Sequence, residues 1–276
     1  MASAAELIYA PTEIVEQTAI DRWNSTRFHF LDVEATQCFV AADDDSITVC
    51  FRGTEADEPH DWIVDLNFDL VDGPLGGRVH EGFYDALSCV WCLLDNEIRR
   101  LQTERSRKLW VTGHSLGAGL ATLAVARWLE QKRPVAGLYT FGQPRTGDRV
   151  FARNFDFAFR PHTFRIVNHL DVVTRTPPRS LGYYHTGTFV YFDQDGQLAY
   201  DISWWRRFLD GWHGAIETIL DWGREGIDDH RMSNYCRCIE KAFTRRVSTP
   251  TSKPIRVAPP NRQAQPAMLK PRRRAA

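Results

Sequence analysis

The chain has 276 residues, of which 25% are charged and 43% hydrophobic, and its formal net charge at pH 7 is -1. This composition is ordinary for a soluble globular protein, and the length suits one large α/β domain or two small ones. The near-zero charge argues against a protein that binds nucleic acid through its overall charge.

The N-terminal segment and the cysteines bear on the cellular compartment. The opening residues, MASAAELIYAPTEIVEQ, carry acids and lack a long apolar core, so we expect no secretory signal, and no stretch is apolar enough to span a bilayer. The six cysteines are therefore expected to be reduced core thiols in a cytoplasmic protein, with membrane association as the alternative. The Cys236-x-Cys238 spacing is too tight for a usual zinc site, so no metal is predicted.

In chain order, apolar periodicity predicts helices and strands in alternation. We expect a helix at 12–23, hairpin strands at 39–40 and 47–51 around the acidic turn AADDDS, a helix at 83–103, a strand at 108–113, a helix at 120–131, and strands at 137–141, 163–167 and 188–192. This alternation predicts an α/β fold in which a mostly parallel sheet carries helices on both faces.

The C-terminal third changes character twice. Residues 201–227 hold four tryptophans among acidic and basic residues, and we expect a helical insert within a folded domain of residues 1–246. Two roles stay open for this insert, a lid that contacts lipid or a hairpin that packs on the core. From Val247 onward the chain has no acids and is rich in Pro, Ala and Arg, which predicts a flexible basic tail at 247–276. This tail is expected to be solvated, with contact to an anionic membrane or polyanion as the alternative.

The motif Gly113-His114-Ser115-Leu116-Gly117 fits the pattern G-x-S-x-G between a predicted strand and a predicted helix. A serine at such a sharp turn stands above the carboxyl end of the sheet, where the start of the helix favours developing negative charge. Ser115 is therefore a candidate nucleophile, and a helix cap is the plainer alternative.

A serine nucleophile needs a base, and the base needs an acid to orient it, in the chain order serine, acid, histidine for this kind of fold. Asp171 follows the predicted strand TFRIV after three further residues and precedes a proline-stiffened loop, which makes it the candidate acid. Two downstream histidines suit the base, His230 on a polar loop before a terminal helix and His185 at a strand entrance. The residues favour His230 only modestly and leave His185 open.

Over residues 39–235 the chain resembles the class 3 lipases, a family with the α/β-hydrolase fold. The motifs that carry the resemblance are CFRGTE, DWIVDLNF, VHEGFYDAL, VTGHSLGAGLA, YTFGQPRTGD, FRIVNHLDVVTRTPP and DDHRMSNY. The resemblance implies a triad of Ser115, Asp171 and His230, because the family's closing histidine motif matches DDHRMSNY. It also implies an oxyanion hole formed by the backbone N–H groups of Thr54 and Leu116, with the Thr54 hydroxyl as a further donor.

The expected function is that of a serine carboxylester hydrolase, a lipase that cleaves acyl glycerols without metal or organic cofactor. The alternatives are a phospholipase, a short-chain esterase, or a non-catalytic lipase-like interaction module. Residues 55–62 are short and acidic where the family has its lid, which argues against interfacial activation. The expected partners are a lipid ester and, at most, a membrane or lipid-droplet surface; neither nucleic acid nor a particular oligomeric state is predicted.

Overall fold

The centre of the computed structural model is an eight-stranded sheet with the order β1-β2-β3-β6-β7-β9-β11-β12, and the described residues are 1–34, 36–54, 67–199 and 223–248. The neighbouring strands from β3 to β11 pair in parallel, whereas β1, β2 and β12 are antiparallel to their neighbours. The strands span Arg27–Val33 (β1), Thr36–Ala42 (β2), Ser46–Phe51 (β3), Lys108–His114 (β6), Gly137–Phe141 (β7), Thr163–Asn168 (β9), Thr188–Phe192 (β11) and Leu198–Ala199 (β12). The predicted mostly parallel sheet is confirmed.

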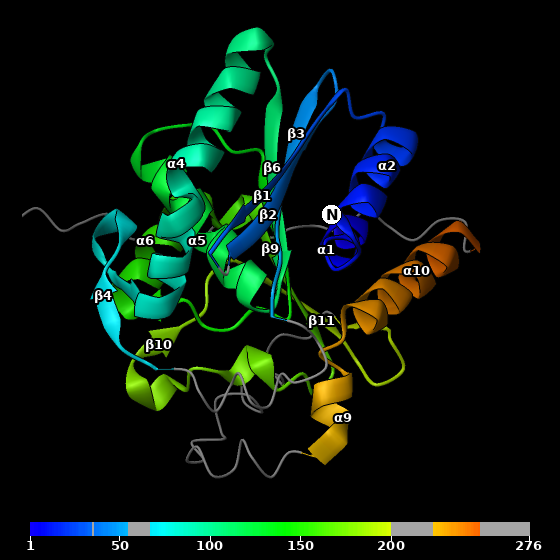
Figure 1. Cartoon of the computed structure of the whole chain (residues 1–276). Coiled ribbons are helices and arrows are strands. Elements are labelled where there is room, and N and C mark those ends of the chain that lie inside the picture. The colour runs from blue at the N-terminus through cyan, green and yellow to red at the C-terminus, as the bar shows by residue number, and fades with distance from the viewer. Residues whose placement is uncertain (35, 55–66, 200–222, 249–276) are drawn as a thin grey trace, which may run out of the picture.

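Helices cover both faces of this sheet, as the alternation predicts (Figure 1). One face carries α4 (Glu81–Glu104), α5 (Leu116–Glu130) and α6 (Arg149–Phe159), and the other carries α1 (Ala2–Leu7), α2 (Thr12–Trp23) and α10 (Met232–Ser248). Each face of the sheet has its own hydrophobic core, and strand β2 contributes to both. Val40 belongs to the core that includes α4 and α5, whereas its neighbour Phe39 belongs to the core that includes α1 and α10. The sheet is thus buried on both faces, as parallel sheets require.

A second, four-stranded sheet has the order β10-β8-β5-β4, and its strands β4 and β10 lie on the same side of the view as α4 and α6 (Figure 1). Its strands are Leu70–Asp72 (β4), Arg78–His80 (β5), Gly147–Asp148 (β8) and Tyr183–Tyr184 (β10), and the remaining short elements are the 3-10 turns Pro74–Gly76, Arg160–His162, Val173–Arg175 and Arg179–Leu181 and the helix α9 (Gly223–Asp228). The sequence did not predict these strands, because two or three residues are too few for a pattern of alternation to emerge.

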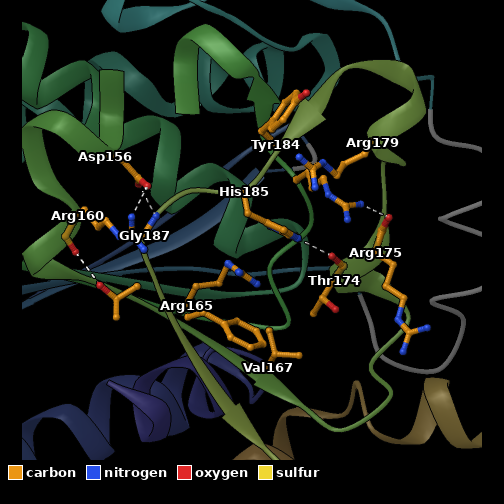
Figure 2. Close-up of a pocket in the computed structure, with 13 residues that line it drawn as sticks. Asp156, Arg160, Arg165, Val167, Thr174, Arg175, Arg179, Tyr184, His185 and Gly187 are labelled. Atoms are coloured by element: carbon orange, nitrogen blue, oxygen red, sulfur yellow. Dashed lines mark hydrogen bonds and ion pairs between the residues drawn. The ribbon is translucent and has the colours of Figure 1, made fainter. Parts of the chain in front are cut away.

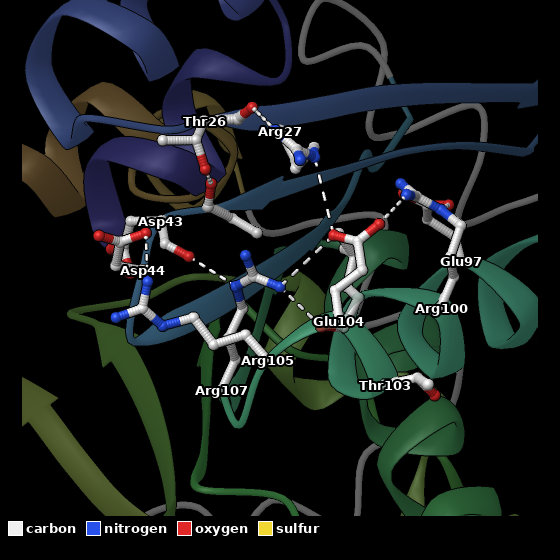
Figure 3. Close-up of polar contacts among 12 residues, drawn as sticks. Thr26, Arg27, Asp43, Asp44, Glu97, Arg100, Thr103, Glu104, Arg105 and Arg107 are labelled. Carbon is white, nitrogen blue, oxygen red and sulfur yellow. Dashed lines mark hydrogen bonds and ion pairs between the residues drawn. The ribbon is translucent and has the colours of Figure 1, made fainter.

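An ionic cluster closes the end of the sheet where β6 begins (Figure 3). Arg107, just before β6, donates hydrogen bonds to the backbone oxygens of Asp43 at 2.7 Å and Leu101 at 2.6 Å. Glu104 lies 3.7 Å from the Nε of Arg27 and 3.8 Å from Arg107. The cluster connects the β2–β3 turn to the end of α4. It lies at the end where the parallel strand β6 begins, so a functional site is expected at the opposite edge, where the carboxyl ends of the parallel strands lie.

Not all of the cysteines lie in the core, although core positions are predicted for all six. All six lie among the described residues and are free; Cys38, Cys50 and Cys238 are buried, but Cys92 is exposed. The prediction is wrong for Cys92 because it lies on the outward side of α4, whose inward side carries Leu87, Val90 and Leu94. None of the described helices has the length and apolar character that crossing a bilayer requires.

Three predicted features fall wholly or largely outside the described residues. They are the short acidic segment at 55–62, most of the tryptophan-rich insert at 201–227, and the tail at 247–276 apart from the end of α10 at Ser248.

Candidate active site

Ser115 is the single residue between the end of β6 and the start of α5. Its backbone, with φ 57° and ψ -131°, has a conformation that residues other than glycine rarely adopt. The flanking glycines make this turn possible. A Cβ on Gly113 would lie 2.3 Å from the carbonyl oxygen of Gly117, and one on Gly117 would lie 2.3 Å from that of Phe51. Strain of about 1–3 kcal/mol at a non-glycine residue persists only where surrounding contacts hold it, and it clusters at functional sites.

Asp171 and His230 form a buried pair. The Nδ1 of His230 lies 3.0 Å from both carboxylate oxygens of Asp171, and the two residues are 2% and 0% exposed. Asp171 also accepts a hydrogen bond from the N–H of Val173 at 2.9 Å and one from the hydroxyl of Tyr235. Burial alone would raise the pKa of Asp171, but His230 and the hydroxyl of Tyr235 hold that pKa below its ordinary value. The carboxylate is therefore ionised and oriented toward the imidazole.

His114 joins this pair to the serine, because it directly precedes Ser115 and its ring stacks on that of His230 at 4.5 Å. Its Nε2 donates to the backbone oxygen of His230 at 2.6 Å, since a carbonyl can only accept, and its Nδ1 then accepts from the hydroxyl of Tyr9 at 2.9 Å. Gly142 packs against the other side of the pair, where an added Cβ would lie 2.7 Å from the ring of His230. These contacts hold Asp171 and His230 at the edge of the sheet where Ser115 lies.

The predicted oxyanion donors flank the serine. Leu116 is the first residue of α5, and Thr54 follows Gly53, whose added Cβ would lie 3.0 Å from the Cβ of Ser115. The Oγ1 of Thr54 is buried and has no hydrogen-bond partner in the part of the chain that the structure describes. A buried hydroxyl without a partner costs about 1–3 kcal/mol. An oxygen of a bound substrate would supply the missing partner.

The other downstream histidines lie elsewhere. His185, the alternative base, bonds through Nε2 to the backbone oxygen of Thr174 at 2.8 Å and lines a separate cavity. His169 pairs with Asp229 at 3.0 Å, and His162 stacks on the ring of Phe159. His213 lies outside the described residues.

Sequence reasoning missed Tyr9, His114 and Tyr235 as supporting residues. His114 and Tyr235 both stand inside quoted motifs, GHSLG and DDHRMSNY, so their position was visible although their role was not. Tyr9 gave no signal, because its contact with His114 spans 105 residues of chain. No three His, Cys, Asp or Glu side chains gather into a possible metal site in the part of the chain that the structure covers.

Acid is expected to destabilise the protein through its buried histidines. Burial, with a contribution from His230, lowers the pKa of His114 to about 3, and burial lowers that of His80 to about 4, from an ordinary value of 6.5. Between these values and 6.5 the unfolded chain binds protons that the folded chain does not, so the free energy of unfolding falls as the pH falls. For His80 we expect a loss of about 1–3 kcal/mol between pH 7.5 and pH 4.5.

Urea unfolding at these two pH values measures the loss. Neither ring nitrogen of His80 has a hydrogen-bond partner in the structure, so His80→Leu removes an ionisable group without breaking a hydrogen bond. This variant should lose less stability on acidification than the wild type. An equal loss in both proteins would contradict the assignment.

Comparison with known proteins adds to this geometry. The family model described as Lipase (class 3) matches residues 48–181. A lipase of Rhizomucor miehei is 35% identical over a region that covers 55% of this chain and 44% of that protein, and a triacylglycerol lipase of Arabidopsis thaliana is 26% identical, with 86% and 63% covered. The chain thus spans less than two thirds of the length of these curated relatives.

A solved triacylglycerol lipase whose catalytic centre is described as a serine protease triad superposes with a TM-score of 0.64 at 27% identity. The superposition covers 74% of this chain and 86% of that one. The α/β-hydrolase fold that the sequence predicts is therefore confirmed.

Proposed function

We propose that this chain, which the class 3 lipase model matches over residues 48–181, is a serine carboxylester hydrolase that cleaves acyl glycerols or related lipid esters. One observation carries the proposal. The buried Asp171–His230 pair, with 3.0 Å between Nδ1 and each carboxylate oxygen, stacks on the residue that directly precedes a serine in a strained turn. A serine that merely caps a helix needs neither an oriented imidazole nor a buried carboxylate.

In the proposed reaction, Nε2 of His230 takes the proton of Ser115 as its hydroxyl oxygen attacks the ester carbonyl carbon. Asp171 keeps the Nδ1 proton in place and stabilises the imidazolium that forms. The backbone N–H groups of Thr54 and Leu116 donate to the oxygen that becomes negative, and each such donor lowers the barrier by about 3–4 kcal/mol. His230 then protonates the leaving alcohol, and an acyl-serine remains. Water then attacks the acyl carbonyl carbon while His230 takes one of its protons, and His230 returns that proton to the oxygen of Ser115 as the carboxylic acid leaves.

The choice of acyl glycerols as substrates rests on the relatives, several of which are named as triacylglycerol lipases. A panel of emulsified triolein, diolein, monoolein, phosphatidylcholine and a soluble butyrate ester tests the proposal. We expect the glycerides to be hydrolysed fastest, and a fluorophosphonate probe, which needs an activated serine, to label the protein. A faster phosphatidylcholine or butyrate reaction would favour the phospholipase or short-chain esterase. Absence of both labelling and hydrolysis would favour a non-catalytic module and refute the proposal.

We further propose that one catalytic domain, residues 1–246, acts in the cytoplasm and contacts membrane or lipid-droplet surfaces peripherally. Six free cysteines support a reducing compartment, in which disulfides are rare. Tryptophans beside basic residues at 201–227, and the basic composition of 247–276, are sequence features that suit an anionic lipid surface.

A further inference from the structure

A cavity of 420 Å³ lies beside the loop that follows Asp171. Its walls come from the end of α6, strand β9, the two 3-10 turns after Asp171 and the start of β11 (Figure 2). Among its described lining residues are five arginines and a single carboxylate, namely Arg145, Arg160, Arg165, Arg175, Arg179 and Asp156. We refer to it as the basic cavity.

Arg165 on β9 is the residue that sets the chemistry of the basic cavity. It is only 8% exposed, its guanidinium lies over the ring of Phe189 at 4.8 Å, and its Nε has no hydrogen-bond partner within residues 1–34, 36–54, 67–199 and 223–248. Burial and the charge of Arg145 lower its pKa to about 9, and Asp156 opposes this shift only in part. A buried guanidinium with an unused N–H is costly unless an anion accepts from it.

The single carboxylate is already engaged on the α6 side of the cavity. Asp156 accepts a hydrogen bond from the N–H of Gly187 at 2.7 Å and lies 3.8 Å from Nη1 of Arg160. In Figure 2, Asp156 and Arg160 lie on one side of the view and Arg175 and Arg179 on the other, with Arg165 and His185 between them. Among the described lining residues, the one carboxylate is thus engaged by Gly187 and Arg160, and no hydrogen bond joins it to Arg165.

His185 adds an acceptor to this basic wall. Its Nε2 carries the hydrogen, because that atom donates to the backbone oxygen of Thr174 at 2.8 Å, and its buried Nδ1 has no hydrogen-bond partner among the described residues. Burial and the charges of Arg165 and Arg145 lower its pKa well below the ordinary value, so the ring is neutral. A ligand that suits the cavity thus carries anionic oxygens for guanidinium groups and one O–H for the imidazole.

We propose that the basic cavity binds a phosphate group, either inorganic phosphate or the head of a phosphate monoester. Protonated phosphate has both anionic oxygens and an O–H, and arginine forks match phosphate oxygens in pairs of parallel hydrogen bonds. The volume of 420 Å³ exceeds what a lone phosphate fills, and the aromatic rings of Tyr184 and Phe189 on the wall suit an organic substituent. This site is independent of the proposed ester hydrolysis.

Calorimetric titration of the full chain with inorganic phosphate, at constant ionic strength set by chloride, tests the proposal. We expect saturable binding to one site, and a loss of affinity of about tenfold or more in Arg165→Gln, which removes a charge-assisted contact. Arg165 is buried, so its variant is at risk of misfolding. A second variant is therefore Arg160→Gln, at the half-exposed edge of the cavity, and its affinity for phosphate should fall by about threefold to tenfold. Circular dichroism shows whether each variant is folded.

Arg153→Gln is the matched control, because Arg153 is an exposed arginine of α6 that does not line the cavity. It should keep the wild-type affinity. Glycerol 3-phosphate, and phosphatidylcholine vesicles with and without phosphatidic acid, distinguish a free monoester from a lipid headgroup. The proposal would be overturned if none of these probes showed saturable binding below about 10 mM. It would also be overturned if Arg153→Gln and Arg160→Gln lost the same amount of affinity.

Discussion

Ser115→Ala is expected to lower kcat for ester hydrolysis by about 10⁴- to 10⁶-fold, because the attacking oxygen is removed and only substrate binding and the oxyanion donors remain. The fold should persist. Alanine differs from serine by one oxygen, and the backbone at this position is held by the hydrogen bond from the N–H of Ser115 to the carbonyl of Phe141 at 3.0 Å. Initial rates on a glyceride emulsion and the melting temperature measure the two effects separately.

The matched control for this variant is Ser180→Ala, because Ser180 is an exposed serine of the 3-10 turn Arg179–Leu181. It should keep wild-type kcat and remain reactive with a fluorophosphonate probe, whereas Ser115→Ala should lose labelling altogether. Wild-type turnover by Ser115→Ala would refute the assignment of the nucleophile.

Asp171→Asn is expected to lower kcat by about 10⁴-fold with little change in KM, because it alters which nitrogen of His230 carries the proton. The carboxylate of Asp171 accepts from His230, from the N–H of Val173 and from the hydroxyl of Tyr235. An asparagine offers one acceptor and one N–H₂ donor in the same space. When the donor faces Nδ1, the imidazole proton moves to Nε2, and Nε2 can no longer take the proton of Ser115.

A second aspartate–histidine pair supplies the control for this variant. Asp229 accepts from Nδ1 of His169 at 3.0 Å and from the N–H of Leu170 at 3.0 Å, and it has no contact with Asp171 that the structure describes. Asp229→Asn should keep kcat within about tenfold of wild type, since His169 takes no part in the proposed proton transfer. If Asp171→Asn also stays within that range, the proposed acid is wrong.

The structure also explains why the support of the site is spread along the chain. Tyr9, which follows α1, contacts His114, and Tyr235 on α10 contacts Asp171; α1 and α10 pack on the same face of the sheet. The imidazole of His230 is thus oriented by the core rather than by its own loop. Such a shell of contacts is what holds a proposed catalytic pair within hydrogen-bond distance.

Local pattern was enough to predict the turn that carries Ser115, since a predicted strand, a predicted helix and the glycines at 113 and 117 between them allow few other conformations. The place of Asp171 shortly after a strand likewise followed from chain order. The residues alone left His185 and His230 open as the base, and family resemblance was needed to favour His230. Strand β1 was missed although Arg27 to Phe30 (RFHF) alternate polar and apolar residues, which is the pattern of a half-buried strand.

What the sequence determined by itself is the alternation of strands and helices and the strained serine turn, because these depend on neighbours within a few residues. Tertiary structure alone decided that His185 bonds to Thr174 and that His230 pairs with Asp171, 59 positions away. It also decided that arginines scattered from 145 to 179 share one cavity. Contacts of this kind arise when distant segments pack on the same sheet, and no short-range pattern of residues encodes them.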